Sequence, residues 1–171
     1  MKVFLIGLPA CGKSTLGREV ALQLKRSFVD LDDEIVKGEG QSVGQIFGRL
    51  GEAQFRNIEK KYLKKWCDHT GDIVMATGGG TPCFLDNMGL INASGLSIFL
   101  DATVSEIATR MMNTELAKRP LFAGQDVSTI AGRILEMRMA RIHFYSQAKI
   151  TLSGDHLNAQ SITEEILALE S

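Results

Sequence analysis

The sequence predicts an α/β fold, with a five-stranded parallel sheet between two layers of helices, in a single domain covering residues 1–171. Short apolar runs alternate along the chain with longer stretches of helical periodicity, a pattern typical of strand–helix–strand units. No repeat, low-complexity tract or linker rich in proline or serine interrupts this alternation. The length of 171 residues and the hydrophobic content of 44% suit one well-buried core.

Five short apolar runs are the expected strands, because each is bounded by Gly, Asp or Ser and is too short for a typical helix. They are Lys2–Ile6, Ser27–Leu31, Asp72–Ala76, Leu96–Leu100 and Lys149–Leu152. Helical periodicity is found at Lys13–Arg26, Gln54–Trp66, Ser105–Met112, Thr129–Met139 and Ser161–Glu170. Right-handed crossovers between parallel strands would place helices on both faces of the sheet.

One segment, residues 113–126, fits neither pattern, because charged side chains are mixed there with Pro120 and Gly124. It lies between two of the expected helices. We therefore expect a mobile lid at about 113–126.

The turn after the first strand carries a phosphate-binding motif. Residues 7–14 read GLPACGKS and match the full pattern G-x-x-x-x-G-K-[ST], directly after an apolar strand and at the start of a helix. Backbone N–H groups and the helix N-terminus would bind a phosphate here, which predicts a P-loop NTPase with a three-layer architecture. The expected nucleotide-binding residues are Ala10, Cys11, Gly12, Lys13, Ser14 and Thr15.

Within this loop, Lys13 supplies a point charge to the β- and γ-phosphates of ATP, and the Ser14 hydroxyl is placed to coordinate Mg²⁺. The guanine-reading pattern N-K-x-D is absent, and the chain has no room for the extra domains of a mechanical ATPase. A small-molecule kinase is the leading class.

Charge and composition exclude other partners. Lys and Arg number 19 against 20 Asp and Glu, and the net charge of -1 offers no long-range attraction for nucleic acid or an anionic membrane. The apolar run Val3–Leu8 is too short to span a membrane. Cys11, Cys67 and Cys83 lack paired metal-ligand spacing, which argues against disulfides and zinc. We expect a cytoplasmic monomer.

Two acidic residues end the second expected strand. The two-residue period of a strand would put Asp30 and Asp32 on one face, beside the P-loop at the carboxyl edge of the sheet. We expect Asp32 to accept the proton of the attacking hydroxyl and Asp30 to hold a water of the Mg²⁺ shell. The alternative, that these acids only cap the next helix, is preferred for Asp33.

Basic residues and glycines further along complete the candidate site. Three successive glycines, Gly78, Gly79 and Gly80, indicate close approach of the backbone to a ligand. Arg56 and Arg141 would each be an ordinary surface charge if taken alone. Together, two guanidinium groups suit a planar carboxylate, so an acidic acceptor is predicted.

Six motifs follow one another along the chain: G-x-x-x-x-G-K-S, F-x-D-x-D, G-E-x-x-F-R-x-x-E, G-G-G, R-P-L and R-x-x-x-Y. They occur in the order and approximate spacing of shikimate kinases, and the chain resembles that family over nearly its whole length. The resemblance implies transfer of the γ-phosphate of ATP to the 3-hydroxyl of shikimate, with Mg²⁺, in aromatic amino-acid biosynthesis.

The resemblance also implies residue roles. Shikimate would be bound by Asp32, Arg56, Gly79 and Arg141, with both arginines on its carboxylate. Arg119, in the R-P-L motif, would move in on the lid toward the transferring phosphate. Arg110 would stack on adenine, although an ordinary cation near a helix end is an equal alternative.

Other readings stay open at this point. The loop interior Leu8–Cys11 lacks the glycine that the commoner family form has before G-K-[ST], and it resembles the loop of some gluconate kinases. A nucleoside monophosphate kinase would show D-G-x-P-R near its lid, which is absent. A catalytically silent nucleotide-binding domain would lack Lys13, Ser14 or Asp32, and all three are present.

Overall fold

The structure of the protein, a computed structural model, describes residues 1–113 and 127–171. Its centre is a parallel sheet with the strand order β2-β3-β1-β4-β5. The strands are β1 (Val3–Ile6), β2 (Ser27–Asp30), β3 (Ile73–Ala76), β4 (Leu96–Asp101) and β5 (Ile150–Ser153). All five predicted strands are therefore confirmed, with bounds that differ by one residue at some ends.

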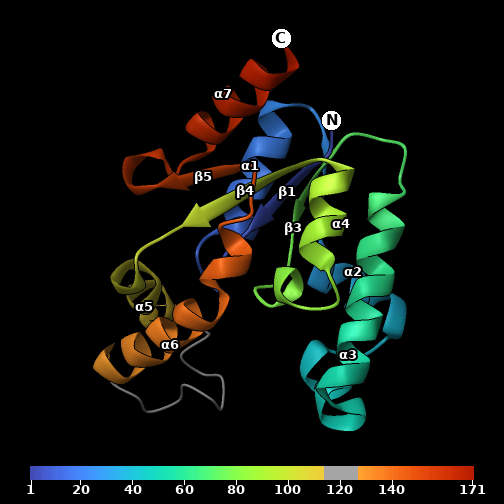
Figure 1. Cartoon of the computed structure of the whole chain (residues 1–171), viewed down its shortest axis with the longest axis vertical. Helices are drawn as coiled ribbons and strands as arrows, with labels where there is room; N and C mark the ends of the chain where they lie inside the picture. The colour runs from blue at the N-terminus through green and yellow to red at the C-terminus, as the bar shows by residue number, and fades with distance from the viewer. Residues whose placement is uncertain (114–126) are drawn as a thin grey trace.

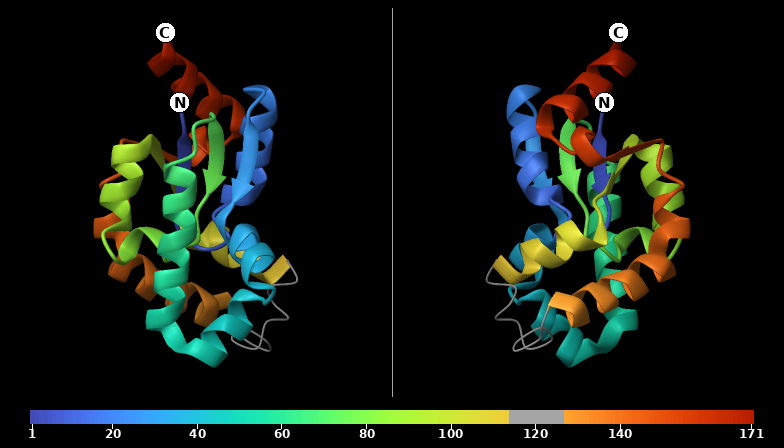
Figure 2. Two further views of the ribbon diagram at one scale, coloured as in Figure 1. Left: turned by 90° about the vertical axis from the view of Figure 1, so that its right-hand side faces the viewer. Right: turned by 90° about the vertical axis from the view of Figure 1, so that its left-hand side faces the viewer.

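Helices cover both faces of this sheet (Figure 2). On one face, α1 packs against β3 and α7; on the other, α3 packs against α4, which contacts β4. The helices are α1 (Lys13–Gln23), α2 (Leu31–Glu39), α3 (Val43–Cys67), α4 (Asn87–Ser94), α5 (Val104–Asn113), α6 (Val127–Tyr145) and α7 (Ala159–Glu170), with 3-10 turns η1 (Thr81–Cys83) and η3 (Gly154–His156). The predicted three-layer α/β architecture is confirmed.

The core lies around the middle strands. Every residue of β1 and β3 is buried, as expected for strands of a parallel sheet that is covered on both faces. At the carboxyl ends of the strands, α2, the first turns of α3, α5 and α6 gather beyond the sheet (Figure 1). This edge therefore carries the loops that could form a ligand site.

Two helices, α2 and α4, were not predicted, and two others, α3 and α6, were predicted too short. Leu31 begins α2 instead of ending a strand, because the Asp30 side chain accepts a hydrogen bond from the Asp32 backbone N–H at 3.1 Å and caps the helix. The α3 helix begins at Val43, behind a capping box formed by Ser42 and Gln45. It is kinked at Gly51, where φ is 77°, and the expected segment Gln54–Trp66 lies wholly after that kink.

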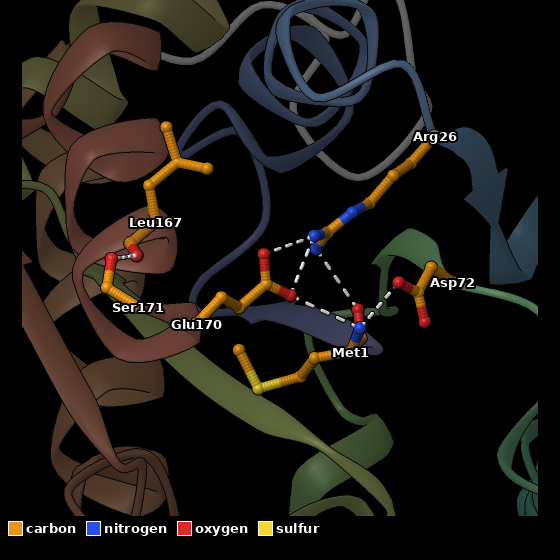
Figure 3. Close-up of polar contacts among 6 residues, drawn as sticks. All are labelled: Met1, Arg26, Asp72, Leu167, Glu170 and Ser171. Atoms are coloured by element: carbon orange, nitrogen blue, oxygen red, sulfur yellow. Dashed lines mark hydrogen bonds and ion pairs between the residues drawn. The ribbon is translucent and has the colours of Figure 1, made fainter.

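A polar cluster closes the opposite end of the sheet, near both chain termini (Figure 3). The Arg26 guanidinium bonds both carboxylate oxygens of Glu170, at 2.5 and 2.7 Å, and donates to the Met1 carbonyl at 3.1 Å. The Met1 amino group lies 2.6 Å from an Asp72 oxygen and 3.2 Å from a Glu170 oxygen. The end of α7 is thereby held against the amino ends of β1, β2 and β3.

Within residues 1–113 and 127–171, no helix combines the length and the apolar character needed to cross a membrane.

Candidate active site

The phosphate-binding loop joins β1 to α1 and depends on two glycines with positive φ. Gly12 is the N-cap of α1, with φ 109°. Gly7 has φ 145°, and a Cβ there would lie 2.8 Å from the Leu100 carbonyl oxygen. Ala10 also has a positive φ, 61°, a conformation that costs an alanine roughly 1 kcal/mol. The loop thus keeps its ligand-binding shape at some cost in strain.

Lys13 is buried within this loop, with 8% of its surface exposed. Its Nζ donates to the carbonyl oxygens of Gly7 at 3.0 Å and Leu8 at 2.7 Å. A third, longer contact of 3.7 Å joins Nζ to Cys11 Sγ, so the ammonium group is held by the loop beside the cavity that it lines.

A cavity of about 460 Å³ lies beside the loop. Its walls include five of the predicted nucleotide-binding residues, together with Leu16 and Leu157, which sequence reasoning missed. The five, all in the loop region, are Ala10, Gly12, Lys13, Ser14 and Thr15. Arg110 of α5, which was also predicted to bind the nucleotide, lines the cavity too and donates to the Cys11 carbonyl at 2.8 Å. Leu157 follows η3 near the other end of the chain, and no motif in the sequence marks it.

The remaining predicted loop residue, Cys11, does not line this cavity, but its thiol accepts a long contact from Lys13 Nζ at 3.7 Å. Its side chain is buried, and its backbone N–H donates to the Leu8 carbonyl at 3.3 Å. Cys11 therefore contributes to the site indirectly, by its backbone carbonyl, which accepts from Arg110, and by its thiol, which contacts Lys13.

The two expected magnesium-binding residues meet directly. The Ser14 hydroxyl donates to Asp30 Oδ2 at 2.6 Å, bringing the start of α1 to the end of β2. A hydroxyl and a carboxylate are hard oxygen donors of the kind Mg²⁺ prefers, and a pair of them leaves the other positions to water and phosphate. The residues present therefore fit a magnesium ion bound with a nucleotide.

Asp32 lies next to this pair, but not for the reason expected. The strand period does not align Asp30 with Asp32, because Asp32 is the second residue of α2. Burial, followed by the negative charges of Asp30 and Glu59, raises the pKa of the Asp32 carboxyl to about 6, while the Lys13 charge opposes that rise. The capping alternative applies to Asp30; Asp33 is exposed and lies 3.7 Å from Arg18.

Arg56 is held on α3 by acids on one side and aromatic rings on the other. Its Nη1 donates to Glu59 Oε2, and its Nη2 to Glu52 Oε1, each at 3.0 Å. The guanidinium carbon lies 4.1 Å from the centroid of the Phe84 ring, with two further rings within 6 Å, those of Phe55 and Phe47. Its Nε is buried and has no hydrogen-bond partner.

Gly78, Gly79 and Gly80 form the turn after β3, and here glycine is required by space. None of the three has positive φ. A Cβ on Gly80 would lie 2.6 Å from Arg56 Nη2, and one on Gly79 would lie 2.8 Å from the Pro9 ring. A Cβ on Gly78 would lie 3.2 Å from Asp32 Oδ1. The turn therefore touches Asp32, the P-loop and Arg56 at once.

Arg141 approaches the same turn from α6. Burial raises the pKa of the Cys83 thiol to about 11, and the positive charges of Arg141 and Arg56 oppose that rise. Both guanidinium groups are thus close enough to Cys83, in η1, to act on its charge. Arg119 lies within 114–126, together with all of the predicted lid except residue 113, outside the described residues.

Comparisons with known proteins point to one family. A family model for shikimate kinase matches residues 9–170. The chain is 38% identical over 167 residues to a shikimate kinase of Parabacteroides distasonis, covering 96% of this chain and 94% of that protein.

The chain belongs to the shikimate kinase family.

Solved structures of family members have the same fold. Shikimate kinase from Bacteroides thetaiotaomicron superposes with a TM-score of 0.89 at 30% identity, over 99% of this chain and 98% of that one. Shikimate kinase from Acinetobacter baumannii, solved in complex with shikimate, gives a TM-score of 0.84 at 27% identity, over 99% and 92% of the two chains.

Family membership confirms the predicted class, an ATP-dependent kinase of the shikimate pathway that acts on a hydroxyl of shikimate. The gluconate kinase alternative rested on the loop interior Leu8–Cys11. That segment closes a phosphate-binding loop here, and Ala10 tolerates the left-handed conformation that a glycine would adopt more easily.

Proposed function

We propose that this chain transfers the γ-phosphate of ATP to the 3-hydroxyl of shikimate, giving shikimate 3-phosphate and ADP. The observation that carries the proposal is the position of Asp32 between the two halves of the site. The charges of Lys13 and Asp30, from the nucleotide half, act on the Asp32 carboxyl. The charge of Glu59, which accepts a hydrogen bond from Arg56 in the acceptor half, acts on the same carboxyl. A proton acceptor there faces both a phosphate site and a carboxylate site.

The nucleotide half is assigned to the cavity beside the P-loop. Lys13 and the backbone of the loop bind the phosphates, and Arg110 and Leu157 flank the remaining space, where the adenine ring fits. Ser14 would coordinate Mg²⁺, and Asp30, its hydrogen-bond partner, would hold a water of the Mg²⁺ shell. When bound, Mg²⁺ neutralises charge that develops on the phosphate oxygens.

The acceptor half is assigned to the glycine turn and its neighbours. Arg56 and Arg141 bind the shikimate carboxylate, because a guanidinium offers paired donors to two oxygens. Glu52 is more than half exposed, so its contact with Arg56 is readily exchanged for the carboxylate of the substrate. Gly78, Gly79 and Gly80 allow the backbone of the turn to lie close to Asp32, Pro9 and Arg56, and so beside the bound acceptor.

The transfer step follows from these positions. Asp32 accepts the proton of the shikimate 3-hydroxyl while the oxygen of that hydroxyl forms a bond to the γ-phosphorus of ATP. The bond between the γ-phosphorus and the bridging oxygen breaks at the same time, and ADP is released. Asp32 must be ionised to accept the proton. Lys13 stabilises the charge on the transferring group, and Arg119, which lies outside the described residues, is assigned the same role.

The test is ADP release from Mg²⁺-ATP with shikimate or gluconate as the only variable. Strong stimulation by shikimate alone is expected. Stimulation by gluconate, or by neither acid, would overturn the proposed roles of Asp32, Arg56 and Arg141 while leaving the P-loop fold intact.

A further inference from the structure

Tyr145 is buried at the junction of three parts of the acceptor site, although no catalytic step requires a phenol. It is the last residue of α6, and its relative exposure is 0%. Its ring packs on Phe99 of β4, with the two centroids 5.1 Å apart. A hydroxyl buried this deeply must be hydrogen-bonded to avoid a penalty of about 1–3 kcal/mol.

That hydroxyl bonds the glycine turn. Tyr145 donates to the Gly79 carbonyl oxygen at 2.5 Å, across 66 positions of sequence. The next residue, Gly80, is the one whose backbone lies against the Arg56 guanidinium. The phenol therefore fixes the segment on which Arg56 rests.

The same hydroxyl faces Arg141. The two residues are four apart on α6, so their side chains are neighbours on one face of the helix. A hydrogen bond from Arg141 works against the rise in pKa that burial imposes on the Tyr145 hydroxyl. Arg141 therefore lies close enough to act on the same oxygen that donates its proton to Gly79.

We propose that the Tyr145 hydroxyl is a positioning group for shikimate, which holds the Arg141 guanidinium in register with the Gly78–Gly80 turn and, through that turn, with Arg56. The inference rests on the proposed role of Arg141 in binding the substrate carboxylate. Two guanidinium groups on different helices can share one planar carboxylate only if their separation is fixed. Tyr145 joins the two supports through a single oxygen atom.

Steady-state kinetics of Tyr145→Phe test the proposal, because the ring and its packing on Phe99 are kept while the hydroxyl is lost. The KM for shikimate is expected to rise by roughly three- to tenfold, within the range of one net hydrogen bond, with the KM for ATP changed less than about twofold. Equal changes in both KM values, no change in either, or failure to fold would overturn the proposal, because each would leave the hydroxyl with a general structural role or none.

The chain provides a matched control in its one other tyrosine. Tyr62 is also largely buried, and its hydroxyl donates to Glu39 Oε1 at 3.0 Å, between α2 and α3. Tyr62→Phe should leave both KM values unchanged. A rise in the shikimate KM equal to that of Tyr145→Phe would remove the specific role of Tyr145.

A double-mutant cycle with Arg141→Met separates this inference from the assignment beneath it. If Tyr145 acts through Arg141, Tyr145→Phe should have little further effect on the shikimate KM once Arg141 is gone. Fully additive effects would overturn the positioning role alone. If Arg141→Met by itself left the shikimate KM unchanged, the proposed carboxylate site would fail, and the positioning role with it.

Discussion

Replacing Asp32 with Asn should make the unliganded protein more stable and the enzyme much slower. The pKa of the Asp32 carboxyl is raised from 3.8 to about 6 by burial and by the charges of Asp30 and Glu59. An elevated pKa means that the folded protein resists the ionised form that catalysis requires. Asparagine keeps the shape and removes the charge.

The size of the expected gain in stability follows from the pKa shift of Asp32. A rise of about two pKa units corresponds to roughly 3 kcal/mol between the two protonation states, the upper limit for the cost of the charge. Asparagine is also desolvated at this site, which reduces the expected gain to about 1–2 kcal/mol.

The pH dependence sets the sign of the stability difference between Asp32→Asn and the wild type. Below about pH 4, Asp32 is protonated in both the folded and the unfolded protein, so the charge costs nothing. Between about pH 4 and 6, the unfolded state loses its proton first and the wild type loses stability; above pH 6 the loss is complete. The advantage of Asp32→Asn should therefore be near zero at pH 4 and full at pH 7.5.

Urea denaturation of both proteins at these two pH values measures the difference, and turnover measured alongside should fall by roughly 10²-fold or more. The reasoning would be refuted by a variant that is less stable than wild type at pH 7.5, or by a gap that is the same at both pH values. Unchanged turnover would remove Asp32 from the mechanism.

Three further substitutions test other parts of the site. Arg56→Lys should raise the KM for shikimate about tenfold or more, because a point charge loses the paired hydrogen bonds, and a change confined to the ATP KM in the same assay would count against the assignment. Ser14→Ala should raise the Mg²⁺ concentration needed for half-maximal rate, since it removes the hydroxyl proposed to coordinate the ion; an unaltered Mg²⁺ titration would contradict the proposed magnesium site. Gly80→Ala should impair shikimate binding, because the added Cβ would lie 2.6 Å from Arg56 Nη2. As a control, Gly132→Ala should leave the kinetics unchanged, because Gly132 is exposed on α6 and an added Cβ would have nothing within 4 Å. Equal kinetics for the two variants would contradict the packing argument.

The fold was predictable from sequence because its strands are short, apolar and bounded by clear turn residues. The helices were harder to predict from the sequence than the strands. The α2 helix begins without any loop after β2, since Asp30 ends the strand and caps the helix at once. The α4 helix, eight residues from Asn87 to Ser94, is too short for periodicity to distinguish it from a strand or loop.

The candidate site was predictable where a local motif dictates geometry. Residues 7–14 fix the backbone of the phosphate loop, and their contacts follow from the motif. Leu157 and Tyr145 are different, because what they touch depends on how distant segments pack. Leu157 reaches the nucleotide cavity from a turn that follows β5, and Tyr145 reaches Gly79 across the sheet edge.

The acidic side chains gathered around Asp32 explain why the turn after β3 consists of three glycines. Asp30, Asp32 and Glu59 repel one another, and Glu59 is almost fully buried at 1% exposure. Glu59 is stabilised there by Arg56 and by the Thr81 hydroxyl, 2.6 Å away. A backbone able to bring Thr81 and Arg56 this close to Asp32 must lack Cβ atoms at residues 78 and 80. The glycines therefore permit the crowding of charge that raises the pKa of Asp32, and that crowding produces a carboxylate suited to accept a proton near neutral pH.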